Sequence, residues 1–549
     1  MRKFFDWIRH EKRSIYFEYS VLVLAIMLPM LLPGYILTLD LVFAPHIAWP
    51  TELTNSYPLQ AVLALLNFAI PADVIEKIVL FAILLLSGVG THRLVRTIPA
   101  SSVAPEYWKW GAYFAGILYM VNPFVYSRFM AGQWQVLLGY ALLPFFVRSV
   151  ITLVAKPSRK SALSVAAWLL AISIVSIHHV GIAVLVAAIA GVLALWRYRK
   201  DSPMLRRFIG WAAASMAIVL VVSSYWLIPA LMGSSSIAQS VESFDTAHHH
   251  AFATNNEGAL GAIGNVIRLQ GFWLDARGLY VLPQDQVPIW GLAALVLWVV
   301  VGIGAVAAWR KQRFMALLFG ISALAAIILA VSPLMSWLSE IIPFFNGYRE
   351  PQKFVNILVF AYAYFGALGV ASLLTRFHER ANPTVTSGVL VGALLLPLVF
   401  TPTMLWGFSG QLSPRHYPAD WYAMNEKLNA DTQDFKVLFL PWHQYMHFGF
   451  AGRIIANPGD KFFDKPFVVG DNPEFKDISP TVPNAAKREI QETLKHPEHL
   501  ARTLTNQNIK YVLLAKEHDF EDYKFLNESP DFNLTTETET LKLYEIKRR

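Results

Sequence analysis

The stretch IWGLAALVLWVVVGIGAVAAWRKQR, residues 289–313, decides the fold. Its first 20 residues carry no charge, and three basic residues follow them: Arg310, Lys311 and Arg313. The hydrocarbon core of a bilayer is about 30 Å thick, and a helix of about 20 apolar residues crosses it. Basic residues beside such a run mark its cytoplasmic end. The stretch therefore predicts a membrane-spanning helix that ends in the cytoplasm.

Ten further apolar stretches divide the first 406 residues in the same way. The eleven predicted spans are 19–38, 76–95, 110–127, 135–154, 161–177, 179–196, 208–231, 289–308, 314–331, 354–374 and 385–406. Every second connection is rich in Lys and Arg, so one set holds 22 basic residues and the opposite set holds five, with Lys77 at a border. The positive-inside rule places the N-terminus and the first set in the cytoplasm. The sparse loops and the C-terminal segment 407–549 are then extracytoplasmic.

The composition agrees with a multi-pass protein of the plasma or inner membrane. The mean hydropathy is +0.42, and only 15% of the residues are charged. The net charge of +8 is explained by cytoplasmic loops that face anionic lipid, so nucleic acid is not an expected partner. No cysteine occurs, which excludes disulfides. The first span follows a charged, aromatic segment without a small-residue cleavage site, so we expect a retained helix rather than a signal peptide.

Residues 161–196 form the least certain part of this topology. A single helix of 36 residues would be about 54 Å long, too long to cross without extreme tilt. It would also move the five basic residues of 197–207 to the outside. Two short spans with a polar turn at His178 and His179 are therefore predicted.

Four extracytoplasmic stretches are too apolar or too long to be simple connections. They are residues 39–75, 122–134, 232–288 and 332–353. The apolar run 59–70 is too short to cross and predicts a helix lying on the membrane. Residues 334–341 have helical spacing and predict a second such helix. Residues 232–288 are rich in Ser, Gly and Asn and predict a mobile loop.

Residues 407–549 predict a small domain of the α/β or α+β class outside the membrane. Buried strands are expected at 435–440, 509–515 and 541–546, and helices at 420–429 and 487–506. The domain organisation is therefore a multi-pass membrane domain, 1–406, and an extracytoplasmic domain, 407–549.

Asp40 is the leading catalytic candidate. It follows the first predicted span directly, at the outer membrane surface and in an apolar setting. A charged group there is costly unless it has a partner or a role, and a carboxylate can serve as a general base. The alternative is an interfacial aspartate that only marks the end of the helix.

A second candidate site lies just before the tenth span, at Arg349, Glu350, Pro351 and Lys353. Proline is favoured at the first position of a helix, whose free N–H groups and dipole attract anions. Two cations beside that helix start, at the depth of a lipid headgroup, favour a phosphate site. The alternative is that Arg349 pairs with Glu350 while Lys353 extends to the interface. Other polar residues of these loops are candidate donor or acceptor contacts: His46, Arg128, Gln133, Trp134 and Glu350.

Three successive histidines are the one candidate metal site. His248, His249 and His250 stand close to Asp245, and imidazole and carboxylate groups bind divalent cations. Adjacent histidines in a flexible loop are more often only solvated, because a good site needs fixed convergence. A divalent cation is thus the only cofactor that the sequence suggests.

Several short motifs resemble the GT-C superfamily of membrane glycosyltransferases. The first span, the pattern Leu-Asp-Leu-x-x-x-Pro at 39–45 and the helix after it resemble the first outer loop of that superfamily, where an acidic residue is the usual catalytic group. The stretches NPFVY (122–126), LGYALLPF (138–145) and YREPQKF (348–354) resemble the arabinofuranosyltransferase-like and YfhO-like branches.

This resemblance implies an enzyme that moves a sugar from a polyprenyl-phosphate donor to an extracytoplasmic glycan or lipid acceptor. Asp40 would be the base of an inverting transfer, and Arg349 and Lys353 would bind the donor phosphate. A non-catalytic scaffold, a flippase or a transporter for lipid-linked glycans is the rival interpretation. Transporters carry ionisable residues at mid-depth or broken helices in paired halves, and the sequence has almost none of either.

Overall fold

The computed structural model describes residues 11–99, 103–233, 235, 246–331, 334–342, 345–380, 383–471 and 484–547. The chain groups into two compact units. The helical unit comprises Met1–Pro29, Thr51–Leu59 and Val79–Gln411, and the sheet unit comprises Met30–Pro50, Gln60–Ile78 and Leu412–Arg549.

Among the described residues, nine helical segments are long and apolar enough to cross a membrane. They are Ser14–Leu31, Ala72–Thr97 (α4), Trp134–Ala155 (α7), Ile177–Tyr198 (α9), Ser202–Leu231 (α10), Trp290–Lys311 (α15), Arg313–Val331 (α16), Pro351–Glu379 and Pro383–Phe400 (α19). Two shorter helices, α5 (Pro105–Met120) and α8 (Arg159–Val175), occupy the positions of the other two expected spans. The prediction of a mainly α-helical, multi-pass membrane protein is confirmed.

The first and last spans end earlier than predicted. Helix α2 (Glu11–Met27) continues as a 3-10 turn, η1 (Leu28–Leu31), where we had expected helix to residue 38. Pro29 and Pro33 lack the N–H that a helix needs, and Gly34 has a φ of 110°. Asp40 therefore lies nine residues beyond the helical segment. The last span ends at Phe400 rather than 406, before η5 (Pro402–Met404) and α20 (Leu405–Ser409).

Residues 161–196 form two helices, as predicted, α8 and α9, of which α9 is long and apolar enough to cross a membrane. The turn was predicted at His178 and His179, but both residues lie inside α9. The break lies at Ser176, whose backbone is extended, with φ −153° and ψ 109°. The Ser176 N–H still bonds to the Ile172 carbonyl at 2.8 Å, and its hydroxyl lies 3.1 Å from Nδ1 of His179. A single residue thus ends α8 and begins α9.

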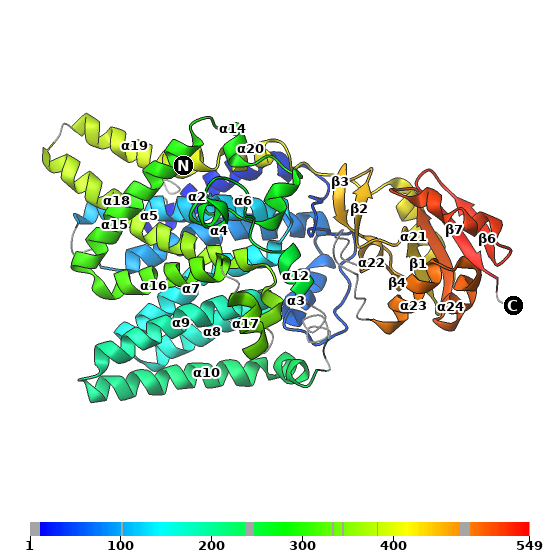
Figure 1. Cartoon of the computed structure of the whole chain (residues 1–549), viewed down its shortest axis with the longest axis horizontal. Coiled ribbons are helices and arrows are strands. Elements are labelled where there is room, and N and C mark those ends of the chain that lie inside the picture. Colours follow the sequence, from blue (N-terminus) through cyan, green and yellow to red (C-terminus); the bar gives the residue numbers. More distant parts are fainter. Residues whose placement is uncertain are drawn as a thin grey trace. The chain divides into compact units, whose positions relative to one another are not determined.

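Helix α18 (Val355–Arg380) is part of the most buried of these nine segments, with 83% of its apolar stretch inside the structure. Figure 1 shows it in the helical unit. It packs against α5, α15 and α16. Glycines allow this close approach: a Cβ on Gly304 would lie 1.7 Å from the Phe365 carbonyl oxygen, and one on Gly369 would lie 2.0 Å from that of Val300. Small residues at helix crossings are a common means of packing in membranes.

Short helices occupy the four stretches that we predicted to lie outside the cytoplasm. They are α3 (Tyr57–Asn67), α6 (Pro123–Met130), α12 (Thr246–Ala251), α13 (Gly261–Ile267), η2 (Trp273–Arg277), α14 (Pro283–Gln286), α17 (Leu334–Ile341), η3 (Phe345–Tyr348) and η4 (Pro351–Phe354). Helices were correctly predicted at 59–70 and 334–341. The described part of 232–288 has several helices, where we had expected only loop. Asn122 caps α6 by accepting the Val125 N–H at 3.1 Å.

The sheet unit contains a five-stranded mixed sheet in the order β4-β1-β5-β7-β6 (Figure 1). The strands are β1 (Lys436–Leu440), β4 (Phe467–Val468), β5 (Ile509–Ala515), β6 (Phe532–Glu537) and β7 (Leu541–Ile546), and a separate hairpin holds β2 (Tyr445–Phe448) and β3 (Arg453–Ala456). Strand β1 is parallel to both β4 and β5, whereas β7 is antiparallel to β5 and β6. The three predicted strands are present, and the four others were not predicted.

Helices cover both faces of this sheet. The helices are α21 (Ala419–Ala430), α22 (Gly459–Phe462), α23 (Ala485–Leu494), η6 (Pro497–His499), α24 (Leu500–Asn506), η7 (Phe520–Tyr523) and α25 (Phe525–Glu528). Leu438 of β1 belongs to the core with α23 and α24, while its neighbour Phe439 contacts Trp421 of α21. A strand buried on both faces is continuously apolar, which made β1 and β5 easy to recognise. The single helix predicted at 487–506 is wrong, because Pro497 divides it.

Candidate functional site

In the sheet unit, the carboxylate of Asp40 is held by a tyrosine from the C-terminal segment. The Tyr445 hydroxyl donates a hydrogen bond to Oδ1 of Asp40 at 2.7 Å. Asp40 is half-buried, and Tyr445 is the first residue of β2. Hydrogen bonds to a carboxylate are stronger than those between neutral groups, so this bond orients the side chain. Sequence reasoning missed Tyr445, which lies 405 residues away along the chain.

Backbone hydrogen bonds fix the segment around Asp40. The Leu39 carbonyl accepts the Ala456 N–H of β3 at 2.7 Å, and the Phe43 carbonyl accepts the Tyr417 hydroxyl at 2.8 Å. The side chains of residues 41–44 are buried. The chain on both sides of Asp40 is therefore anchored within the sheet unit rather than left as a loose loop.

Two acids at the start of α4 support the chain before Asp40. Asp73 accepts the Gly34 N–H at 3.1 Å, and Glu76 accepts the Ile36 N–H at 2.9 Å. Lys77 pairs with Asp73 at 3.2 Å. These side chains satisfy backbone donors that neither helix nor sheet pairs, so they shape the loop.

In the helical unit, a charged cluster surrounds Arg128 of α6, which is fully buried. Its guanidinium group donates to the carboxylate of Glu350 and to the side-chain oxygens of Gln133 and Gln352. The same group stacks 4.0 Å from the ring centre of Phe272. Buried charges are found only with such compensation, because an isolated one would cost several kcal/mol.

Lys353 and Arg349 extend this cluster. The Lys353 ammonium lies 3.6 Å from Glu350 and donates to Nε2 of His178 at 3.2 Å. Burial opposes ionisation of Glu350, but the cations of Lys353 and Arg128 outweigh it and hold its pKa below the ordinary value. The guanidinium of Arg349 lies 4.6 Å from the ring centre of Phe252. Lys353 is itself buried, so it does not extend to the interface.

His179, the neighbour of His178 in the sequence, bonds with two further polar side chains. His179 accepts or donates at both ring nitrogens, 3.0 Å from the Asn356 amide and 3.1 Å from the Ser176 hydroxyl. Among the described residues, Arg128 Nε, Gln352 Nε2 and Asn356 Oδ1 are buried without a hydrogen-bond partner. Such atoms are rare in folded proteins, and each needs a water, an ion or a ligand.

Comparison with known proteins identifies the fold. No protein-family profile and no curated protein sequence match the chain. The structure of arabinofuranosyltransferase AftD from Mycobacteria is similar, with a TM-score of 0.61, 14% sequence identity, and coverage of 98% of this chain and 40% of AftD. A mutant form of AftD gives a TM-score of 0.62 over 98% and 42% of the two chains. The chain has the GT-C fold.

The GT-C fold spans nearly the whole chain, although the chain corresponds to only about two fifths of the length of AftD. A weaker likeness, with a TM-score of 0.45 and 11% identity, is to ArnT from Cupriavidus metallidurans bound to undecaprenyl phosphate, over 97% of both chains.

The GT-C fold brings several of the predicted site residues together. Arg128, Gln133, Glu350 and Lys353 form one cluster, to which the structure adds Gln352 and His178. Pro351 begins a 3-10 turn, η4, that precedes α18, where we had expected the first turn of the helix itself. Trp134 is the first residue of α7, and His46 is exposed in the sheet unit.

The predicted histidine metal site falls partly outside the described residues. Asp245 lies there, as does the side chain of His248. His249 is half-buried and His250 is exposed, both on α12.

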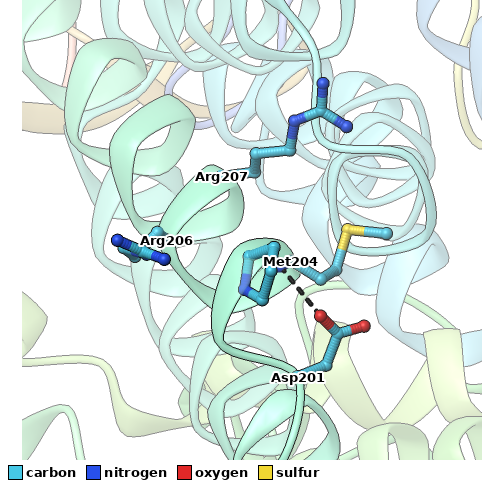
Figure 2. A pocket seen from close by; sticks show the side chains of 5 residues that line it. Asp201, Met204, Arg206 and Arg207 are labelled. Carbon is cyan, nitrogen blue, oxygen red and sulfur yellow. Dashed lines mark hydrogen bonds between the residues drawn. The ribbon is translucent and has the colours of Figure 1, made fainter.

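A hollow of about 390 Å³ lies at the start of α10 (Figure 2). It is lined by Asp201, Pro203, Met204, Arg206 and Arg207. The Asp201 carboxylate accepts the Met204 N–H at 3.1 Å and so caps the helix. All five residues come from one helix end. The hollow therefore has the character of a surface depression rather than of a reaction site.

Proposed function

We propose that this chain is a GT-C glycosyltransferase that moves a sugar from a polyprenyl-phosphate donor to a glycan or lipid acceptor outside the cytoplasm. The observation that carries the proposal is the anchored Asp40. The GT-C superfamily places an acidic catalytic group in the corresponding outer loop, and here that loop is fixed by its own hydrogen bonds. The AftD that shares this fold is an arabinofuranosyltransferase.

Asp40 acts as the general base. Its carboxylate removes the proton of the acceptor hydroxyl as that oxygen bonds to the anomeric carbon of the donor sugar. The bond from the anomeric carbon to the phosphate oxygen breaks, and the lipid phosphate leaves with the electron pair. Attack opposite the leaving group inverts the anomeric centre. Tyr445 is a positioning residue, because its hydrogen bond to Oδ1 fixes the carboxylate.

Arg349 and Lys353 bind the donor phosphate. The named charged groups of the cluster are the cations Arg128, Arg349 and Lys353 and the anion Glu350, which leaves a net charge of +2 when histidine is neutral. A net positive charge in a poorly hydrated site favours an anion, and cations beside the leaving phosphate stabilise its developing charge. The donor phosphodiester carries one negative charge and gains a second as the bond to the sugar breaks, so the site favours the departing phosphate.

The buried polar atoms without a protein partner support the same proposal. Arg128 Nε and Gln352 Nε2 are donors, and Asn356 Oδ1 is an acceptor. A phosphate with its sugar offers acceptors for the first two and hydroxyl donors for the third, directly or through water. Arg128 and Gln133 are then candidate donor contacts beside the phosphate.

The test is a transfer assay with the purified full chain and a panel of polyprenyl-phosphate sugars. The release of free polyprenyl phosphate and the appearance of transferred or hydrolysed sugar are both measured. We expect one donor of the panel to be consumed by the wild type. Asp40→Asn keeps the size of the side chain and removes the base, so turnover should fall by about 100-fold or more.

Glu52→Gln is the matched control, because Glu52 is an exposed acid in the same extracytoplasmic stretch. It should leave turnover unchanged. Tyr445→Phe should reduce turnover less than Asp40→Asn does, and it should leave the KM for the donor unchanged. Near-normal turnover in Asp40→Asn would remove Asp40 from the mechanism, and consumption of no donor in the panel would contradict the proposed function.

A further inference from the structure

Two histidines and an aspartate that have no role in the proposed transfer meet at one end of the five-stranded sheet. His443 follows β1, and His518 and Asp519 follow β5. Strands β1 and β5 are parallel neighbours, with Leu440 paired to Leu514. Their carboxyl ends therefore lie side by side, and the loops after them meet. In open sheets with parallel strands, ligands bind in this position.

The ligand atoms of these three side chains converge. One donor atom from each of His443, His518 and Asp519 lies within 4.8 Å of the others. Nε2 of His443 is 2.9 Å from Oδ2 of Asp519, and the two imidazole rings are 4.9 Å apart between centres and nearly perpendicular. The ligands of a tetrahedral zinc ion, bound at about 2.0–2.1 Å, are about 3.3 Å apart. The ligand atoms of the trio, one pair at 2.9 Å and all within 4.8 Å, lie close to that spacing.

The surrounding contacts hold the group in place. The His443 carbonyl accepts the Asn457 amide at 3.3 Å, and the Trp442 N–H donates to the Tyr523 hydroxyl at 2.9 Å, which joins the two loops. Oδ1 of Asp519 is buried and, within the described part of the chain, has no hydrogen-bond partner. His518 has a φ of 52°, an uncommon value for a residue other than glycine, and its side chain is exposed.

We propose that His443, His518 and Asp519 bind one divalent cation of the zinc class. Two imidazoles and one carboxylate suit zinc and its neighbours, whereas Mg²⁺ and Ca²⁺ prefer oxygen ligands alone. The metal joins the loop after β1 to the loop after β5. Three protein ligands leave a fourth position open, and exposure of His518 gives water or an acceptor carboxylate or hydroxyl access to it. The proposed transfer reaction does not use these three side chains.

The competing interpretation is a simple hydrogen bond between His443 and Asp519 with a solvated His518 beside it.

The test uses the full chain with His248, His249 and His250 replaced by alanine, which removes the other histidine group. This protein is first stripped of metal with a chelator. It is then titrated with Zn²⁺ against a chromophoric chelator, and Co²⁺ replaces Zn²⁺ in a parallel titration read by its visible absorption.

We expect one Zn²⁺ per chain, an absorption band of low-symmetry Co²⁺, and no competition from Mg²⁺. His518→Ala should weaken binding by about 100-fold or more, since even residues that only support a ligand cost 10–100-fold. His496→Ala is the control, because His496 is an exposed histidine outside the trio, and it should change nothing. The His518 side chain is exposed, so the His518→Ala variant should fold normally. Equal Zn²⁺ affinity in His518→Ala and its parent, or no bound Zn²⁺ in the parent, would overturn the proposal.

Discussion

The buried pair of Arg128 and Glu350 makes a strong prediction about stability. Glu350→Gln keeps the shape of the side chain and removes its charge. Arg128 is fully buried and would lose the carboxylate that compensates its charge, a change that costs about 3–5 kcal/mol in other proteins. The oxygens of Gln133 and Gln352 still accept from the guanidinium, so we expect a value near the lower end, about 3 kcal/mol. That loss is roughly a 140-fold change in the unfolding equilibrium.

The loss can be measured by unfolding the purified protein with SDS in mixed micelles and following helix content by circular dichroism. Glu340→Gln is the matched control, since Glu340 is an exposed acid on α17. It should change the free energy of unfolding by less than about 0.5 kcal/mol. A loss below about 1 kcal/mol in Glu350→Gln would refute the argument, because it would mean that Arg128 does not depend on this carboxylate.

The stability that the pair of Arg128 and Glu350 contributes should decrease as the pH falls. The pKa of Glu350 is lowered in the folded protein, so its ionised form contributes stability above the ordinary value of 4.5. The difference between wild type and Glu350→Gln should therefore be constant above pH 4.5 and shrink as the pH falls below it. A difference that grows on acidification would contradict the assignment of Glu350 as ionised.

Three further predictions concern other parts of the molecule. Arg349→Ala should weaken donor binding by about 1.5–3 kcal/mol and Arg349→Lys should restore little, whereas unchanged affinity would exclude Arg349 from the phosphate site. Gly304→Ala should cost about 1–3 kcal/mol of unfolding free energy because its Cβ would meet the Phe365 carbonyl, while Gly302→Ala, which has open space, serves as the control. A reporter fused after Arg549 should be active only outside the cytoplasm, and cytoplasmic activity would disprove the topology.

Hydropathy and charge predicted all nine segments that, among the described residues, are long and apolar enough to cross a membrane, because local composition decides each of them. Two further predicted spans correspond to the shorter helices α5 and α8. The ends of the spans were less predictable. We extended the first span to residue 38, although Pro29 and Pro33 end the helical segment at Leu31. Pro497 divided a predicted helix in the same way. These errors came from giving apolar content more weight than the missing N–H groups of proline.

The candidate sites were predictable only where their residues are close in sequence. Arg349, Glu350 and Lys353 form one short motif, so the sequence drew attention to them. Arg128 joins Glu350 across 222 residues, and Tyr445 meets Asp40 across 405. The hairpin of β2 and β3 is short and only partly apolar, so nothing local marked its tyrosine. Such partners are fixed by tertiary packing, which a single sequence does not reveal.

The sheet unit is assembled from two stretches, residues 30–78 and the segment from residue 412 onward, that are translated far apart in time. The Leu39 carbonyl and the Asp40 carboxylate cannot form their hydrogen bonds until Ala456 and Tyr445 have been translated. At 5–20 residues per second, 405 residues take about 20–80 s to translate. During that interval the translocation machinery or lipid has to shield the unfinished segment around Asp40. We expect a chain truncated before residue 445 to lack both of these partners of the Asp40 segment.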